Sequence, residues 1–177
     1  DSYKPSAPAD EKWTADVNDT GDITCYRTGT EIVIAGNGTG KIQANADSTH
    51  MFSNAAYNTQ FFKLTSIENL TLLDTSNVTN MRYMFYDCTK LKNLDLSTFN
   101  TTNVTNMNGM FSGCSKLVTI YASDKWNTDK VDNSIYMFSS CTNLRGDISF
   151  NTFYVDKTYA KTSGGYLTYK AASTKTL

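Results

Sequence analysis

Hydrophobic positions recur with a fixed period along the central part of this chain. The pentapeptide Asn-Val-Thr-Asn-Met occupies residues 77–81 and returns at residues 103–107. After each copy the same apolar residue types follow, at spacings of 26 and then 27 residues. Positions that repeat within one chain are those that a stack of copies dictates, so we predict a structural ladder of buried side chains. Its members form four columns: Met84, Met110 and Met137; Phe85, Phe111 and Phe138; Cys88, Cys114 and Cys141; Leu91, Leu117 and Leu144.

Each repeat unit changes its hydrophobic period midway. Between residues 78 and 88 the apolar residues stand mainly three or four positions apart, which predicts a short amphipathic helix. Leu94 and Leu96 then alternate with polar residues, which predicts a strand with one buried face. A unit of this size cannot bury its apolar edge alone, so we expect the units to stack, with their strands in a parallel β-ladder.

The predicted fold class is an α/β repeat solenoid, a short leucine-rich-repeat-like stack of about four rungs. The stack is assigned to residues 49–150, with an irregular first copy that begins at His50. Residues 22–48 are predicted to form a β-meander that caps the N-terminal end, because short alternating segments are separated by glycine-containing turns. Residues 1–21 are interpreted as an N-terminal extension, and residues 151–177, rich in tyrosine, as a C-terminal cap and tail.

The repeat resembles that of a known protein family. The unit from Asn80 to Thr101 reads Asn-Met-Arg-Tyr-Met-Phe-Tyr-Asp-Cys-Thr-Lys-Leu-Lys-Asn-Leu-Asp-Leu-Ser-Thr-Phe-Asn-Thr, and it is similar to the repeat of BspA-like leucine-rich-repeat surface proteins of bacteria. The resemblance covers residues 49–150, and the segments 156–160 and 164–168 resemble the closing part of that family. It implies a secreted or surface-displayed bacterial protein, of a kind often proposed to bind host or neighbouring-cell components. The family brings no catalytic residues with it.

Composition and charge exclude several classes of partner. Charged residues make up 19% of the chain and the formal net charge is -1, whereas a nucleic-acid-binding protein needs a basic stripe. The longest apolar runs, such as residues 32–35, fall far short of the roughly 20 residues that a transmembrane helix needs. We therefore expect no nucleic-acid partner and no membrane insertion.

The sequence offers little catalytic or metal-binding chemistry. His50 is the only histidine, so sites that need several histidines are excluded, and we expect it to lie at the start of the first copy as a capping or surface residue. Residues 36–41 are glycine-rich but lack the spacing of a phosphate-binding loop, so we interpret them as a hairpin turn. No two cysteines are spaced as in a metal site. We therefore predict that the chain is not an enzyme, binds no metal and needs no cofactor.

The repeated cysteines leave two interpretations open. Cys88, Cys114 and Cys141 lie on the apolar stripe, so we predict buried free thiols that act as small apolar residues. Adjacent rungs would also bring two sulfur atoms near each other, so one disulfide is the alternative. Cys25 lies in the predicted meander without an obvious partner.

The outward strand positions that differ between copies form the candidate binding face. They are Thr71, Asp95 and Tyr121, continued by Ser149 in the fourth copy. Tyr121 is the best anchor, because a tyrosine adds a large contact area at low entropic cost. The alternative is that this ring only covers a neighbouring side chain.

The predicted function is that of a non-catalytic repeat module of a bacterium, secreted or on the cell surface. We expect it to act in adhesion or ligand binding, with a protein or glycan on a host or neighbouring cell as its partner. The alternative is a structural spacer or filament subunit, which would self-associate in a surface assembly.

Overall fold

The fold is built from short strands joined by turns. The computed structural model describes residues 11–14, 23–28, 30–36, 42–53 and 64–173. No α-helix forms within these ranges, and none of their helical segments is long and apolar enough to cross a membrane. The elements in chain order are β1 (Glu11–Thr14), β2 (Ile23–Thr28), β3 (Glu31–Gly36), β4 (Ile42–Gln43), β5 (Ser66–Glu68), the 3-10 helix η2 (Leu70–Leu72), β6 (Leu73–Asp74), β7 (Asn93–Asp95), β8 (Thr119–Ala122), the 3-10 helix η3 (Lys157–Tyr159) and β9 (Leu167–Tyr169).

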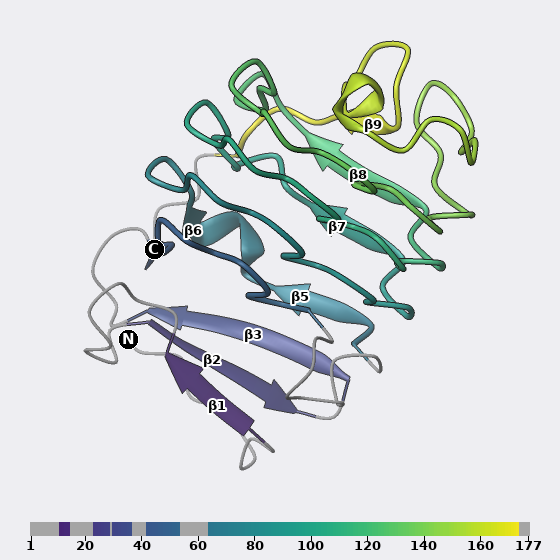
Figure 1. Ribbon diagram of the computed structural model, residues 1–177. Helices are drawn as coiled ribbons and strands as arrows, with labels where there is room; N and C mark the ends of the chain where they lie inside the picture. The colour runs from purple at the N-terminus through teal and green to yellow at the C-terminus, as the bar shows by residue number, and fades with distance from the viewer. Residues whose placement is uncertain (1–10, 15–22, 29, 37–41, 54–63, 174–177) are drawn as a thin grey trace.

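The strands within the described ranges form three sheets. β1, β2 and β3 are antiparallel neighbours, and β3 also pairs with β5 in parallel. β4 pairs with β6 in parallel, and β7, β8 and β9 form a parallel sheet. Figure 1 shows the strands stacked one above another, from β1 at one end to β9 at the other. The fold is thus mostly strands with parallel sheets, which is compatible with a repeat-like, β-rich architecture.

The N-terminal strands differ in two respects from the sequence prediction. β2 and β3 lie in the expected meander, but β1 adds a third antiparallel strand from within residues 1–21. β4, at the end of the expected meander, pairs instead with β6 of the first copy.

Residues 78–88 do not form the helix that their apolar spacing predicts, so the α part of the predicted fold class is wrong. The backbone makes consecutive turns, each closed by a hydrogen bond from an N–H group to the carbonyl three residues earlier. An α-helix would join residues four apart and would use its N–H groups within the segment. The turn hydrogen bonds are Met84 N–H to Met81 O at 3.2 Å, Tyr86 N–H to Tyr83 O at 3.1 Å and Cys88 N–H to Phe85 O at 3.4 Å.

The N–H groups between these turn bonds link one repeat copy to the next. In a helix these N–H groups would bond within the segment. The turns leave them free to bond to the next copy, so the buried backbone is satisfied both within a copy and between copies. The third copy, residues 106–114, repeats the same pattern towards the fourth. The links from the second copy to the third are Met81 N–H to Asn106 O at 2.8 Å, Tyr83 N–H to Asn108 O at 2.9 Å, Phe85 N–H to Met110 O at 2.9 Å and Asp87 N–H to Ser112 O at 2.7 Å.

Left-handed residues set the shape of these turns. Tyr83 and Asp87 have φ values of 54° and 58°, and the equivalent Gly109 and Gly113 have values of 58° and 82°. Residues in this region cannot continue a right-handed helix. The apolar residues between them still face inward at spacings of three and four, so the turns and a helix share one hydrophobic pattern.

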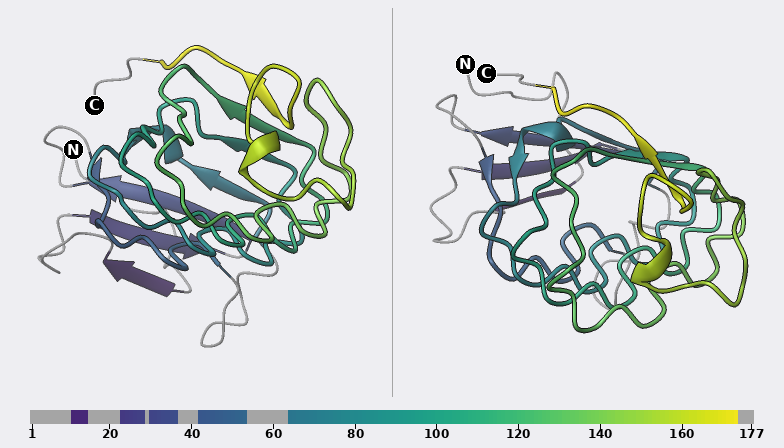
Figure 2. Two further views of the ribbon diagram at one scale, coloured as in Figure 1. Left: turned by 45° about the horizontal axis from the view of Figure 1, so that its top comes forward. Right: turned by 90° about the horizontal axis from the view of Figure 1, so that it is seen from above.

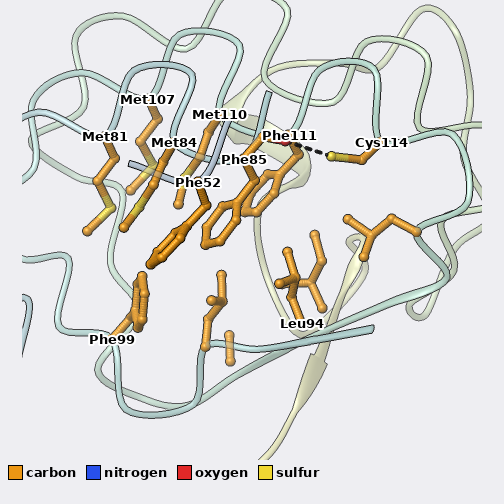
Figure 3. Close-up of a cluster of buried hydrophobic side chains, with 14 of the residues drawn as sticks. Phe52, Met81, Met84, Phe85, Leu94, Phe99, Met107, Met110, Phe111 and Cys114 are labelled. Carbon is orange, nitrogen blue, oxygen red and sulfur yellow. Dashed lines mark hydrogen bonds between the residues drawn. The ribbon is translucent and has the colours of Figure 1, made fainter. Parts of the chain in front are cut away.

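The turn side and the strand side of each copy face each other, as Figure 2 shows from above, and the buried side chains form the core between them. All twelve residues of the predicted ladder are without exposed surface. Equivalent phenylalanines stack from copy to copy, and Figure 3 shows part of this column beside the methionines. Tyr166 closes the column edge-on, with ring centres 5.3 Å apart. The stacked pairs are Phe52 with Phe85 at 5.4 Å, Phe85 with Phe111 at 5.7 Å, and Phe111 with Phe138 at 5.5 Å.

Buried polar groups also repeat between copies. The Thr101 hydroxyl donates to Asn127 O and accepts from Asn127 N–H, both at 2.7 Å. Thr75 makes the same pair of bonds with Asn100, at 3.0 and 2.9 Å. The cysteine thiols form a second polar column, in which each donates to a phenylalanine carbonyl of the preceding copy: Cys88 to Phe52 O, Cys114 to Phe85 O and Cys141 to Phe111 O, all at 3.0 Å.

The last strand of the parallel sheet comes from the C-terminal segment and not from the fourth copy. Ser149 forms only an isolated antiparallel bridge with Arg145. β9 takes the place beside β8, with Leu167 opposite Ile120. The outward position expected at Ser149 is therefore filled by Thr168, which stands opposite Tyr121.

Candidate functional site

The predicted binding face lies on the outer side of the parallel sheet. Asp95 of β7 stands opposite Tyr121 of β8, and Thr168 of β9 follows in register. Asp95 and Tyr121 are both half-buried. Thr71 does not join them, because it lies in η2 and not on a strand. The structure therefore brings two of the three predicted residues together and adds Thr168 to them.

Lys170, directly after β9, occupies this face. Its ammonium group forms an ion pair with the Asp95 carboxylate at 2.5 Å and lies 5.3 Å from the centre of the Tyr121 ring. Asp95 also accepts hydrogen bonds from the N–H and the hydroxyl of Ser97, at 3.1 and 2.7 Å. Partial burial alone would raise the pKa of Asp95, but the hydrogen bonds from Lys170 and Ser97 hold it below its usual value. The carboxylate and the ring are thus already engaged within the chain.

Sequence reasoning missed Thr168 and Lys170. The signal was the alternation in Leu167-Thr168-Tyr169, which matches the inward and outward positions of β8. The 26- and 27-residue spacing directed attention to Ser149 instead, because the C-terminal strand falls outside that period.

A second exposed group lies on the turn side. His50, Arg82, Tyr83 and Tyr86 make up what we call the turn-side aromatic group. The Tyr83 ring stacks on His50 at 5.1 Å, meets Tyr86 edge-on at 5.1 Å and lies under the Arg82 guanidinium at 4.7 Å. Tyr83 is half-buried at the centre, and the other three are exposed. The group offers a ligand aromatic surface, a phenol hydroxyl and a cation.

The backbone conformation of Tyr83 is costly. Its φ of 54° lies in a region that bulky residues rarely adopt, at a cost of about 1 kcal/mol. The third copy has Gly109 at this position, and the Tyr83 ring fills the space beside it, since a Cβ on Gly109 would lie 2.1 Å from Tyr83 Cε1. The stack accepts glycine here, so the fold does not require a tyrosine. Residues with strained backbone conformations of this kind cluster at functional positions.

His50 is held by contacts within the chain. Its Nδ1 lies 2.8 Å from the Ser53 hydroxyl. Partial burial, together with the charge of Arg82, lowers the pKa of His50, which favours the neutral ring at neutral pH. Over the ranges that the structure describes, no group of three or more His, Cys, Asp or Glu side chains is placed to hold a metal ion.

The repeated thiols are buried and unpaired. Cys88, Cys114 and Cys141 form no disulfide. The hydrogen bond with Cys114, followed by burial, raises the pKa of Cys88 well above its usual value, and burial does the same for Cys141. A thiol with a raised pKa is a poor nucleophile at neutral pH. The side chain of Cys25 lies outside those that the structure describes.

One protein family matches the chain. The model of the family described as "Mycoplasma protein of unknown function, DUF285" matches residues 46–165, which is more than half of the sequence. The chain belongs to the DUF285 family. DUF285 is associated with BspA-like surface proteins. The matched DUF285 region includes the turn-side aromatic group, Asp95 and Tyr121, whereas Lys170 lies beyond it. No curated protein and no solved structure matches the chain.

Proposed function

We propose that this DUF285 chain is a short solenoid of the leucine-rich-repeat type and serves as a non-catalytic binding module, secreted by a bacterium or displayed on its surface. Its partner is a protein or glycan on a host or neighbouring cell, bound through the turn-side aromatic group. Two findings support this proposal. Equivalent residues of successive copies bridge in parallel, from Asp47 through Asn80 and Asn106 to Asn133. The association of DUF285 with BspA-like surface proteins agrees with display outside the cell.

One observation carries the assignment of the site: neighbouring copies agree where they are buried and differ where they are exposed. Residues 80–88 and 106–114 share the pattern Asn-Met-x-x-Met-Phe-x-x-Cys. Stacking dictates the shared positions. The fourth copy also has a tyrosine, Tyr136, at the position of Tyr83, but it lacks equivalents of Arg82 and Tyr86, so stacking does not explain the combination of these residues in the second copy. At the variable positions the second copy has Arg82, Tyr83, Tyr86 and Asp87, and the third has Asn108, Gly109, Ser112 and Gly113.

The chain itself supplies the variant that tests the proposal. Arg82→Asn, Tyr83→Gly and Tyr86→Ser together give the second copy three of the third copy's outward residues, so this copy-exchange variant should keep the stack. Wild type and variant are displayed on beads at equal density and screened against matrix proteins and glycans. We expect the wild type to bind at least one ligand class and the variant to lose about tenfold or more in affinity, because aromatic and arginine side chains dominate such contacts.

Tyr121→Ala is the matched control, because it removes an aromatic side chain from the strand face instead. It should bind as the wild type does. If Tyr121→Ala loses binding and the copy-exchange variant does not, the turn-side assignment is wrong and the strand face is the site. If the wild type binds nothing in a broad panel, the spacer or filament subunit becomes the better interpretation.

A further inference from the structure

One left-handed position of the turn recurs in all four copies and forms a column along the stack. It is occupied by His50, Tyr83, Gly109 and Tyr136, whose φ values lie between 54° and 59°. A row of backbone hydrogen bonds of 2.9–3.1 Å joins them, because each N–H donates to the peptide group that directly precedes the next member. The four residues therefore lie one above another, and the three side chains leave the backbone towards the same side.

Three of these four positions carry an aromatic ring on a backbone that favours glycine. Gly109 shows that the stack accepts glycine here, so stacking does not require the rings. The rings of His50 and Tyr83 stack on each other at 5.1 Å. Tyr136 has no ring contact within the part of the chain that the structure describes, and it is 61% exposed. Because residues in strained conformations cluster at functional positions, Tyr136 points to the same use as Tyr83.

The Tyr83 ring covers the gap that Gly109 leaves in the column. A Cβ on Gly109 would lie 2.1 Å from Tyr83 Cε1, so the ring reaches over the third copy, towards Tyr136. Neighbouring copies are about 4.8 Å apart, as hydrogen-bonded chains in a ladder are. From His50 to Tyr136 the column takes three such steps and spans about 14 Å. We call His50, Tyr83 and Tyr136 the aromatic strip.

We propose that the ligand of the turn side is a linear glycan of β-1,4-linked pyranose units, whose chain lies along the aromatic strip, parallel to the stack. This inference rests on the proposed binding function and names its ligand. A pyranose ring presents a face of weakly positive C–H groups, which suits the negative face of an aromatic ring. An extended β-1,4-linked chain advances by about one copy per sugar, so about three to four units cover the strip.

Polar groups flank the strip on the second copy. The exposed Arg82 guanidinium lies 4.7 Å from the centre of the Tyr83 ring, and Tyr86 meets that ring edge-on at 5.1 Å. The guanidinium donates hydrogen bonds, and the Tyr86 phenol both donates and accepts them. Sugar hydroxyl groups project from the rim of each pyranose ring and can use both. The second copy is therefore the end of the strip that fixes the ligand, and Tyr136 is the end that a longer ligand reaches.

A peptide strand is the poorer fit for this surface. Extended peptides add to an open backbone edge, where unpaired N–H and carbonyl groups supply the affinity. In the row through the strip, the N–H groups of Tyr83 and Gly109 are already bonded to the next copy. Recognition must therefore come from side chains, as it does for stacked sugar rings.

Isothermal titration calorimetry of the full 177-residue chain tests the proposal with β-1,4-linked oligomers of glucose and of N-acetylglucosamine, two to six units long. We expect at least one series to bind. Its dissociation constant should fall about fivefold to tenfold between two and four units, because a longer chain adds a stacking contact with Tyr136. Beyond four units it should level off, because the strip ends there.

Two variants separate the ends of the strip. Tyr136→Gly copies Gly109, so it should fold normally, bind the disaccharide as the wild type does and lose the gain from two to four units. Tyr83→Gly also copies Gly109, and it should weaken the binding of every length, because Tyr83 lies at the end that fixes the ligand. Thermal unfolding verifies that both variants are folded.

Tyr169→Ser is the matched control, because Tyr169 is 60% exposed but lies on the strand face in β9. It should leave every affinity unchanged. The proposal is overturned if neither series binds, if affinity does not depend on length, or if folded Tyr136→Gly keeps the gain. In each case a ligand that the bead screen finds, and that the copy-exchange variant loses, would still support the proposed function. That function fails separately, when the copy-exchange variant loses nothing.

Discussion

The turn side and the strand side of one copy are linked to neighbouring copies through different backbone conformations. Both join neighbouring copies by hydrogen bonds, but β7 and β8 pair over only three residues, from Asn93 to Asp95. On the turn side, every N–H from Met81 to Cys88 donates, either to a turn carbonyl, to the next copy or to the Asn80 side chain. The turn side is therefore the more fully specified of the two.

The difference teaches where residue identity matters. A strand needs only alternation, so its outward positions accept Asp95 and Tyr121 alike. A turn with a left-handed residue at fixed places needs glycine there or a residue that tolerates strain. Substitutions on the turn side should accordingly cost more than those on the strand side.

The largest effect is expected for Met110→Asp on the turn side. Met110 has no exposed surface, so the variant places an unpaired charge between two copies. The free energy of unfolding in urea should fall by about 4 kcal/mol. Thr105→Asp is the control, because the fourth copy has Asp132 at this exposed position, and its effect should stay near zero. A Met110→Asp protein that melts like the wild type would show that this column is not core.

Gly109→Ala should have the next largest effect, about 2 kcal/mol. The new Cβ would lie 2.1 Å from Tyr83 Cε1 at a φ of 58°. Gly164→Ala separates the two causes, since Gly164 has a φ of 64° but nothing within 4 Å of a Cβ. Its cost should be about 1 kcal/mol, from the backbone alone. Equal costs for the two variants would mean that Tyr83 moves aside freely.

Thr101→Val probes the corner that joins the two sides. It removes the hydroxyl that bonds to both backbone groups of Asn127, so unfolding free energy should fall by about 1.5 kcal/mol. Thr98→Val is a matched substitution, because the buried Thr98 hydroxyl has no hydrogen-bond partner among the described residues. That variant should be neutral or slightly stabilising. The opposite ranking in chemical denaturation would refute the role of the Thr101 hydroxyl.

The smallest effect is expected on the strand face, for Lys170→Gln. An exposed ion pair contributes about 0.5 kcal/mol, so the variant should lose no more than that at neutral pH. Because folding lowers the pKa of Asp95, the contribution is complete above the unfolded value of about 4 and is lost as the pH falls through the folded value. Unfolding curves of the two proteins should therefore converge in acid. A difference that persists when Asp95 is protonated would have another cause.

The repeat in the sequence predicted the inward positions well, for a physical reason. A residue that recurs at one phase, such as Met84 and Met110, meets its own equivalent above and below, so its environment is set by the period alone. The strand in the second copy followed from the alternation of Leu94 and Leu96 in the same way. In the third copy β8 lies at the equivalent place, opposite β7.

The turns could not be read from hydrophobic spacing, because a helix gives the same spacing. The available signal was Gly109 with Gly113, two glycines four apart in a segment where a helix would be weakened by each. They mark the two left-handed positions of the turn. In the second copy Tyr83 and Asp87 occupy these two positions, so only a comparison between copies shows that they are left-handed.

The candidate site was predictable only in part. The facing of Asp95 and Tyr121 follows from the repeat register, but their contact with Lys170 joins residues 75 positions apart, and no repeat relates them. Thr71 was misplaced because Leu70 and Leu72 alternate as in a strand but lie in a 3-10 helix. The turn-side aromatic group was missed because Arg82 and Tyr86 have no identical equivalents in the third and fourth copies, and the ladder was predicted from identical residues.

The links between copies on the turn side have an electrical consequence. The peptide group between Arg82 and Tyr83 accepts a hydrogen bond from His50 N–H and donates one to Asn108 O. The peptide group between Asn108 and Gly109 donates in turn to Ile135 O. Three other rows of peptides, through Met81, Phe85 and Asp87, also donate towards the C-terminal end, whereas the row through Thr79 donates the opposite way. Aligned peptide dipoles add up, as they do along an α-helix, and neighbouring bonds polarise one another. Most peptide dipoles of the turn side are thus parallel, and their sum places partial positive charge at the fourth copy and partial negative charge at the first.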